Sequence, residues 1–303
     1  MKNQICKICD QEISDNFHFW KNHKIKEKDY QEKYNPKFDL LTGEKLEFKS
    51  RENYDSTDFK SRINLRKYIE NKPIEETVDY LSNYLKKRKE TKNLIFAPGE
   101  FECRTLCFPS ITYIEKFYKN NITYKDICNK SDLKCLFDYN VKLSFLNNNN
   151  EIICDTRENI FLKFDNFKIK KLNYGDYNIE GSKIFIERKS LIDATGTLSQ
   201  GFERFEKEIV RCAADESYLI VLIEEKFEHL LSFSYLPHMK KVKATEQFIL
   251  SRIRQLLRKY PNNLQFLCVD NRAESIRVIK NIFNCQNNIK NIDLQWAYNN
   301  KLI

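Results

Sequence analysis

The chain has 303 residues, of which 41% are hydrophobic, and this is enough for one sizeable core with one or two small modules beside it. Its 52 lysines and arginines outnumber 43 aspartates and glutamates, and the net charge of +9 favours a polyanionic partner such as nucleic acid. The sequence has neither a membrane-length apolar run nor the apolar stretch of a secretory signal, so we expect a soluble, intracellular protein with no membrane partner.

The N-terminal residues 1–35 carry a pattern typical of a metal site. Ten cysteines in a chain without an export signal favour metal binding over a disulfide framework. Cys6 and Cys9 are followed by His18 and His23, and two thiolates with two imidazoles can complete a tetrahedral shell around Zn²⁺. We therefore predict a small Cys2His2-like zinc module, which resembles short zinc fingers of phage and viral DNA-acting proteins. Free thiols and surface histidines are the alternative.

Residues 36–92 are predicted to form a helical connector. Apolar residues recur at helical spacing towards its end, at Ile74, Val78, Leu81 and Leu85. The basic run at 86–89 that follows is typical of a solvated helix face.

Residues 93–146 predict a small cysteine-containing helical module that binds DNA, with short helices at 111–118 and 123–130. Aromatic residues alternate with lysines there, and the segment resembles the small helical repeats with which homing endonucleases grip DNA. An ordinary aromatic core is the alternative. A second zinc site is also open, and it would use Cys103, Cys107, Cys128 and Cys135. The asparagine run that follows marks a boundary.

From residue 150 to residue 303 strands and helices alternate. Strands are predicted at 151–158, 167–179, 182–190, 217–225 and 264–270, and helices at 202–215, 244–260 and 273–283. This alternation indicates an α/β fold, with a central sheet flanked by helices.

Ionisable side chains gather at the ends of these predicted strands: Asp155, Glu158, Asp176, Glu187 and Lys189. Phosphodiester hydrolysis needs hard oxygen ligands for Mg²⁺ and a cation that orients the attacking water. Alternation along residues 184–189 puts Glu187 and Lys189 on one face and Arg188 on the other. A hairpin turning at 180–182 would bring Asp176 close to Glu187. For an isolated E-x-K, an exposed ion pair is the alternative.

The order of these residues resembles the nuclease domain of the XPF family of structure-specific endonucleases. The family pattern is D-x-R-E, then G-D, then E-R-K-x3-D. This sequence has Asp155-Thr-Arg157-Glu158, Gly175-Asp176, and Glu187-Arg188-Lys189 followed by Asp193. The next predicted helix contains Arg204 and Glu208, which are similar to the family's R-F-x-x-E element.

The resemblance spans roughly residues 150–285 and implies a restriction-endonuclease-like core with a mixed central sheet. It implies hydrolysis of DNA with Mg²⁺ or Mn²⁺, leaving a 5′-phosphate and a 3′-hydroxyl. The implied metal ligands are Asp155, Glu158, Asp176 and Glu187, with Lys189 at the water. Supporting roles are implied for Arg157, Arg188, Asp193, Arg204 and Glu208. For Arg204, an ion pair with Glu208 on the helix face is an equal alternative. A homo- or heterodimer through the nuclease domain is a further expectation.

The sequence also departs from this family. No glycine follows Gly201, so the C-terminal part lacks the glycine-bearing hairpins of the family's helix-hairpin-helix modules, and no P-loop occurs. Targeting to branched, flapped or nicked DNA in repair, recombination or replication would then fall to residues 1–146. The alternatives are a noncatalytic DNA-binding scaffold subunit and a site-specific, homing-type nuclease of a mobile element.

Overall fold

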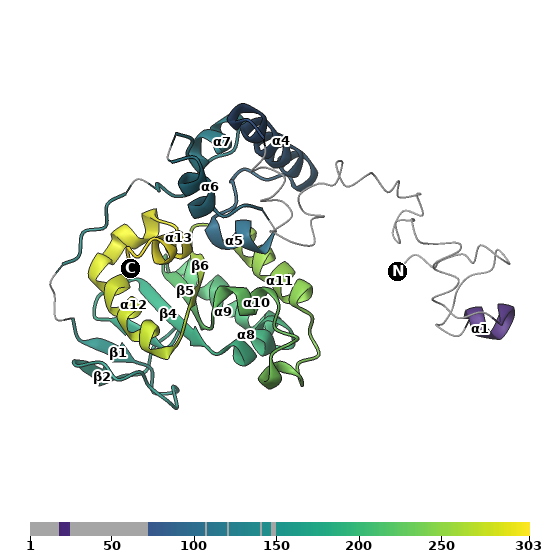
Figure 1. Ribbon diagram of the computed structural model, residues 1–303. Helices are drawn as coiled ribbons and strands as arrows, with labels where there is room; N and C mark the ends of the chain where they lie inside the picture. Colours follow the sequence, from purple (N-terminus) through teal and green to yellow (C-terminus); the bar gives the residue numbers. More distant parts are fainter. Residues whose placement is uncertain (1–17, 25–71, 107, 120, 140, 147–149) are drawn as a thin grey trace. The chain divides into compact units, whose positions relative to one another are not determined.

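The computed structural model describes residues 18–24, 72–106, 108–119, 121–139, 141–146 and 150–303 (Figure 1). The chain divides into two compact units, residues 1–55 and 56–303. In the first unit the described part is the short helix α1 (His18–His23). Residues 36–71 of the predicted helical connector, and Cys6, Cys9 and Cys107, lie outside the described residues. Within these ranges no helix has both the length and the apolar character of a membrane span.

A six-stranded mixed sheet organises the second unit. Its strands are β1 (Ile152–Cys154), β2 (Phe167–Ile169), β3 (Tyr177–Ile179), β4 (Ile184–Lys189), β5 (Tyr218–Glu224) and β6 (Leu264–Val269). They lie side by side in the order β2-β1-β3-β4-β5-β6. The strand β3 runs antiparallel to both of its neighbours, while β1 pairs in parallel with β2, and β4, β5 and β6 are parallel. The predicted α/β fold with a mixed sheet is confirmed.

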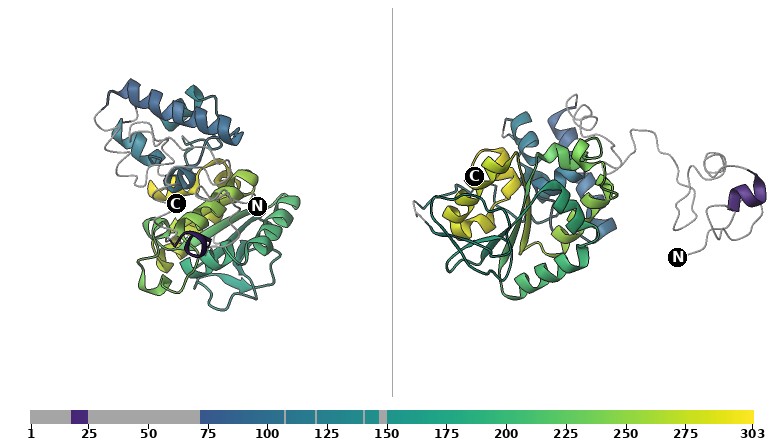
Figure 2. Two further views of the ribbon diagram at one scale, coloured as in Figure 1. Left: turned by 90° about the vertical axis from the view of Figure 1, so that its right-hand side faces the viewer. Right: turned by 90° about the horizontal axis from the view of Figure 1, so that it is seen from below.

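Helices cover both faces of this sheet (Figure 2). On one face lie α8 (Leu191–Leu198), α9 (Phe202–Ala214), α10 (Phe227–Leu231) and α11 (Glu246–Lys259); on the other lie α12 (Arg272–Cys285) and α13 (Leu294–Asn299). The strand β5 is apolar up to its last residue, Glu224, because Leu219 and Val221 pack under the first layer while Ile220 and Leu222 pack under the second.

Residues 72–146 are mainly helical, with α4 (Ile74–Lys92), α5 (Glu100–Thr105), α6 (Ile111–Phe117) and α7 (Tyr124–Lys130). Ser110 caps α6, and Thr123 and Asp126 form a capping box on α7, so the two helices begin where the sequence predicts them. The helix α4 packs against α7, so the predicted boundary between residues 92 and 93 does not separate two cores. Ile74 is exposed, whereas Leu81 and Leu85 are buried.

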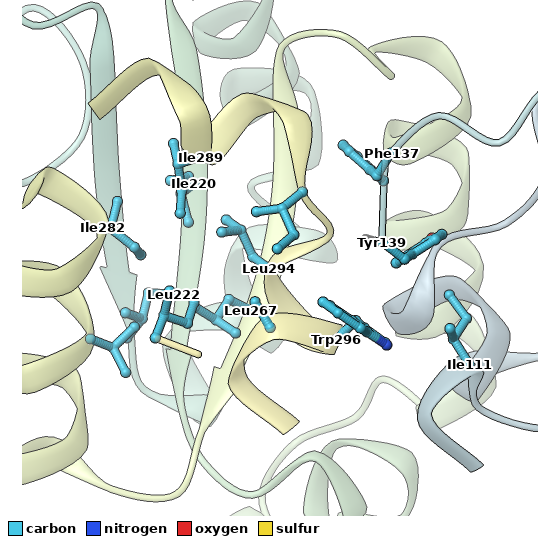
Figure 3. Packing of buried hydrophobic residues seen from close by; sticks show 14 of the residues in the cluster. Ile111, Phe137, Tyr139, Ile220, Leu222, Leu267, Ile282, Ile289, Leu294 and Trp296 are labelled. Carbon is cyan, nitrogen blue, oxygen red and sulfur yellow. The ribbon is translucent and has the colours of Figure 1, made fainter. Parts of the chain in front are cut away.

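The helical region and the sheet share one hydrophobic core, and α13 joins them. The indole Nε1 of Trp296 donates to Glu115 of α6 at 3.0 Å, and its ring lies 5.5 Å from the ring of Tyr139. Figure 3 shows Trp296 beside Tyr139, with Leu267 of β6 on its other side. The backbone N of Glu100 donates to Asp293, which precedes α13, at 2.9 Å. The predicted modules 93–146 and 150–303 therefore pack as one body.

Candidate active site

The hairpin of β3 and β4 brings Asp176 next to Glu187. Gly181 adopts a φ of +73° at the turn, as the predicted hairpin requires, and Tyr177 pairs with Ile186. The backbone N of Asp176 donates to the carbonyl of Ile186 at 2.8 Å, and the backbone N of Arg188 donates to Asp176 Oδ2 at 2.8 Å. The Asp176 carboxylate is thus fixed by the strand that carries Glu187.

Glu187 and Lys189 lie together on one face of β4. Ile184 and Ile186 join the core on the α12 side, whereas Phe185 packs on the side of α8 and α9, so the strand alternates as predicted. Lys189 Nζ donates to Glu187 Oε1 at 2.7 Å. The ammonium group is therefore held beside the Glu187 carboxylate.

The helix α9 adds a third carboxylate to this region. Glu208 Oε1 accepts a hydrogen bond from the backbone N of Gly175 at 3.3 Å. Gly175 has a φ of +58°, and a Cβ at this position would lie 2.8 Å from the carbonyl oxygen of Ile186. Only glycine fits there without a backbone shift, and this explains the residue that precedes Asp176.

Crowding of these carboxylates changes their titration. Burial, followed by the charge of Glu187, raises the pKa of Asp176 well above its usual value. Burial also raises the pKa of Glu187, with the charge of Glu208 adding to it, although Lys189 and Arg157 act in the opposite direction. Ionising both carboxyl groups at once is therefore unfavourable in this site.

Asp155, a predicted metal ligand, has its oxygens occupied by protein donors. The side chain is 0% exposed, and Oδ1 accepts from Arg157 Nε at 2.6 Å and from the Arg157 backbone N at 2.8 Å. Oδ2 accepts from Arg157 Nη2 and from the backbone N of Leu172. Burial opposes ionisation of Asp155, but these hydrogen bonds outweigh it and lower the pKa. Asp155 accepts four hydrogen bonds from protein donors and anchors Arg157.

Glu158, the other predicted ligand from this segment, is engaged through one of its two oxygens, and its charge also helps to raise the pKa of Asp176. Its Oε1 accepts from Arg188 Nη2 at 2.6 Å, and Arg188 Nη1 donates to Glu224 Oε2 at 2.7 Å. These contacts lie on the face of β4 opposite Glu187. The structure therefore brings Asp176, Glu187 and Lys189 together, and it uses Asp155 and Glu158 to hold two arginines.

The remaining predicted residues have simpler surroundings. Asp193 accepts from the hydroxyl of Ser190 at 2.6 Å, and the Ser190 hydroxyl accepts from the backbone N of Asp193 at 3.2 Å, so the two residues cap α8. Arg204 is exposed on α9. The alternative ion pair between Arg204 and Glu208 does not form in the described part of the chain, because Glu208 turns to Gly175.

The predicted zinc ligands lie only partly within the described residues. His18 and His23 belong to α1, and their ring centroids are 5.5 Å apart. In the helical region Cys103 and Cys128 are buried and Cys135 is half-buried. Among the described residues no three histidine, cysteine, aspartate or glutamate side chains converge as a metal site. The arrangement of Cys103, Cys128 and Cys135 therefore does not support a second zinc site.

Sequence reasoning gave no role to Glu224, the last residue of β5. A signal for it exists, because β4 and β5 are parallel and a carboxylate at the carboxyl end of the second strand meets the end of the first. In the sequence, Glu224 lies at the end of the apolar strand predicted at 217–225, and that pattern alone indicates no further role.

The fold and the hairpin define an α/β protein with a crowded acidic site at one end of a mixed sheet. Residues 149–282 match the family model of the ERCC4 domain, and the predicted resemblance to the XPF nuclease domain is thereby confirmed for this segment. No curated protein matches the chain in sequence.

Two solved structures, XPF from Aeropyrum pernix with and without DNA, are similar at 18% identity and a TM-score of 0.34. Each match covers 43% of this chain and 62% or 61% of the other, so this chain spans about three-fifths of the proteins that it matches.

Proposed function

We propose that this protein is a divalent-metal-dependent DNA endonuclease whose reaction takes place at the end of the β3–β4 hairpin. The observation that carries the proposal is the pair of crowded carboxylates, Asp176 and Glu187, fixed beside the ammonium group of Lys189. The ERCC4-domain match over residues 149–282 and the net charge of +9 support a nuclease acting on a polyanion. By family resemblance the core is restriction-endonuclease-like.

The donor set fits Mg²⁺ or Mn²⁺. Mg²⁺ is usually bound by one or two carboxylates together with waters and substrate phosphate oxygens, and Asp176 and Glu187 would supply those two carboxylates. The raised pKa values of this pair reflect burial and like-charge repulsion, which a divalent cation would relieve. When bound, such an ion polarises the phosphate and the attacking water.

The chain's own groups would complete the site. Lys189 would orient the attacking water, because its Nζ is held at the edge of the ligand pair by Glu187. Arg157, whose side chain is 61% exposed while anchored to Asp155, would contact a phosphate of the substrate. By resemblance the products carry a 5′-phosphate and a 3′-hydroxyl, and branched, flapped or nicked DNA is the proposed substrate.

The test is cleavage of duplex, nicked, flap and junction DNA with Mg²⁺ or Mn²⁺ by the wild type, Asp176→Ala and Glu187→Ala. We expect each substitution to lower the rate by about a hundredfold or more, as loss of a group that orients a metal does. Glu274→Ala is the matched control, because Glu274 pairs with Arg277 on α12, outside the acidic cluster. A second measurement is the rise in melting temperature with divalent ions, which both variants should lose.

Other outcomes would redirect the proposal. Undiminished cutting by both variants removes the proposed site. Tight DNA binding without cleavage favours the noncatalytic scaffold, and cutting of one unique duplex sequence favours the homing-type nuclease.

We also propose that the N-terminal unit binds Zn²⁺ through Cys6, Cys9, His18 and His23. Two imidazoles on α1, with ring centroids 5.5 Å apart, support this ligand set. Elemental analysis of purified protein should find about one zinc per chain, and Cys9→Ser should lose it. Equal zinc contents in the two proteins would contradict the proposal.

A further inference from the structure

Arg188 stands between Glu187 and Lys189 in sequence, but its guanidinium lies on the opposite face of β4. Two carboxylates hold it there, Glu158 at 2.6 Å and Glu224 at 2.7 Å. The side chains of all three residues are nearly buried, with 11% to 13% of each exposed. We call this group, Glu158, Arg188 and Glu224, the arginine clamp.

The arginine clamp ties together several elements at the same edge of the sheet. Glu158 belongs to the segment after β1, and Glu224 ends β5. Arg188 Nη2 also donates to the carbonyl of Ile160 at 3.0 Å, and this carbonyl accepts a second bond from Arg272, at the start of α12, at 3.1 Å. The Arg188 side chain thus attaches the end of β4 to two neighbouring segments, and Arg272 attaches the start of α12 to the first of them.

Stability alone does not account for this arrangement. One guanidinium faces two carboxylates, so the clamp carries an excess negative charge. Arg188 Nε and Glu224 Oε1 are buried without a hydrogen-bond partner in the described part of the chain. Burying such groups costs free energy, and apolar residues of similar volume often stabilise a core as well or better. A geometric role explains why the clamp is nevertheless built.

The geometry fixed by the clamp is that of the acidic site. The backbone N of Arg188 donates to Asp176 Oδ2 at 2.8 Å, so a shift of this peptide moves the Asp176 carboxylate. Glu187 and Lys189 are its two chain neighbours and project from the other face. Holding the Arg188 side chain in place therefore sets the positions of Asp176, Glu187 and Lys189 together. A displacement of about 1 Å in such groups is enough to lower a catalytic rate substantially.

We propose that Glu224 is a positioning residue for the nuclease site, acting through Arg188, which it shares with Glu158, across the sheet. The inference rests on the proposed function. Glu224 touches neither the acidic cluster nor the face on which substrate would lie, so its effect must pass through the strand.

Glu224→Gln tests this role because it keeps the shape of the side chain and removes its charge. Steady-state cleavage should show kcat reduced by about tenfold to a hundredfold, the range found when partners of metal ligands are changed. The KM for DNA should change little, and the Mn²⁺ concentration needed for half-maximal rate should rise. If that variant melts below the assay temperature, Glu224→Asp replaces it, because this change keeps the charge but moves the carboxylate away from Arg188, and it should give the same pattern.

Two measurements without cleavage separate positioning from ordinary stabilisation. The first is the melting temperature in EDTA, compared with Glu274→Gln, which removes a surface pair by the same chemical change. The second is the divalent-ion concentration that gives half of the metal-induced rise in melting temperature, which Glu224→Gln should increase and Glu274→Gln should leave unchanged.

The outcomes distinguish the inference from the proposed function. Wild-type kcat and an unchanged metal requirement in Glu224→Gln overturn the positioning role, even if the variant melts earlier. A wild type that cuts no DNA overturns the nuclease proposal, while the metal-induced rise in melting temperature still tests the clamp. A wild type that neither cuts DNA nor responds to the ion rules out both.

Discussion

Two aspartates that lie next to each other have opposite electrostatic surroundings. The backbone N of Asp155 donates to the carbonyl of Asp176 at 2.8 Å, so the two residues are neighbours in the sheet. Asp155 is surrounded by donors that lower its pKa, whereas burial and the charge of Glu187 raise the pKa of Asp176. The first carboxylate stabilises the fold, and the second is costly unless a cation joins it.

The comparison shows why a motif of acids cannot be read as a list of ligands. Each carboxylate in D-x-R-E and G-D was predicted to hold a metal, because each is a hard oxygen donor at a strand end. In the structure Asp155 accepts hydrogen bonds from Arg157 and from the backbone N of Leu172, and Glu158 accepts one from Arg188. The acids that remain crowded and short of donors are the candidates for binding an ion.

The largest expected effect on stability comes from Asp155→Asn, which should lower the free energy of unfolding by about 3 kcal/mol at pH 7. The change puts an amide NH2, which cannot accept a hydrogen bond, in place of one oxygen of a buried carboxylate that accepts four. The lowered pKa of Asp155 means that its contribution is present above the ordinary carboxyl pKa and is lost as pH falls through the folded value. Denaturant unfolding at pH 7 and pH 3 should therefore show a difference from wild type that shrinks in acid. Asp165→Asn, an exposed control, should change little. Equal destabilisation at both pH values would contradict the anchoring role.

Gly175→Ala should cost about 2 kcal/mol, because residue 175 has a positive φ and its Cβ would press on the Ile186 carbonyl. The same shift should lower cleavage, since Asp176 follows directly. Gly196→Ala is the matched control, because Gly196 lies within α8 with open space around it and alanine favours a helix. If thermal unfolding showed the two alanine variants to be alike, the tight approach at Gly175 would be disproved.

Asp176→Asn should have the smallest effect on stability and the opposite sign, raising the free energy of unfolding by about 1 kcal/mol at pH 7 in EDTA. A carboxyl group whose pKa rises on folding favours the fold at low pH, and this contribution is lost as pH increases through the folded pKa. The gain from asparagine should therefore disappear near pH 4. A variant less stable than wild type in EDTA at pH 7 would show that Asp176, like Asp155, is a structural anchor.

Local patterns in the sequence were sufficient for much of the fold and for the centre of the site. The apolar run at 217–225 predicted a strand, and β5 forms there with both faces buried. Alternation along 184–189 separated Arg188 from Glu187 and Lys189, and the turn at 180–182 predicted that Asp176 would meet Glu187. These inferences hold because pleat and hairpin geometry relate only residues that are close in the chain.

The sequence by itself determined where most strands form, which face of β4 carries Glu187 and Lys189, and that Asp176 meets Glu187 across the hairpin. The single strand predicted at 167–179 was wrong, because this segment forms β2 and β3 on opposite sides of β1. Only the tertiary structure decided that Asp155 holds Arg157, that Glu158 and Glu224 hold Arg188, and that α13 packs on the helical region. Each of these contacts, apart from that between Asp155 and Arg157, joins residues far apart in the chain. The pairing of a charged side chain depends on which donor the packed chain brings within hydrogen-bonding distance, and residue spacing alone does not contain that information.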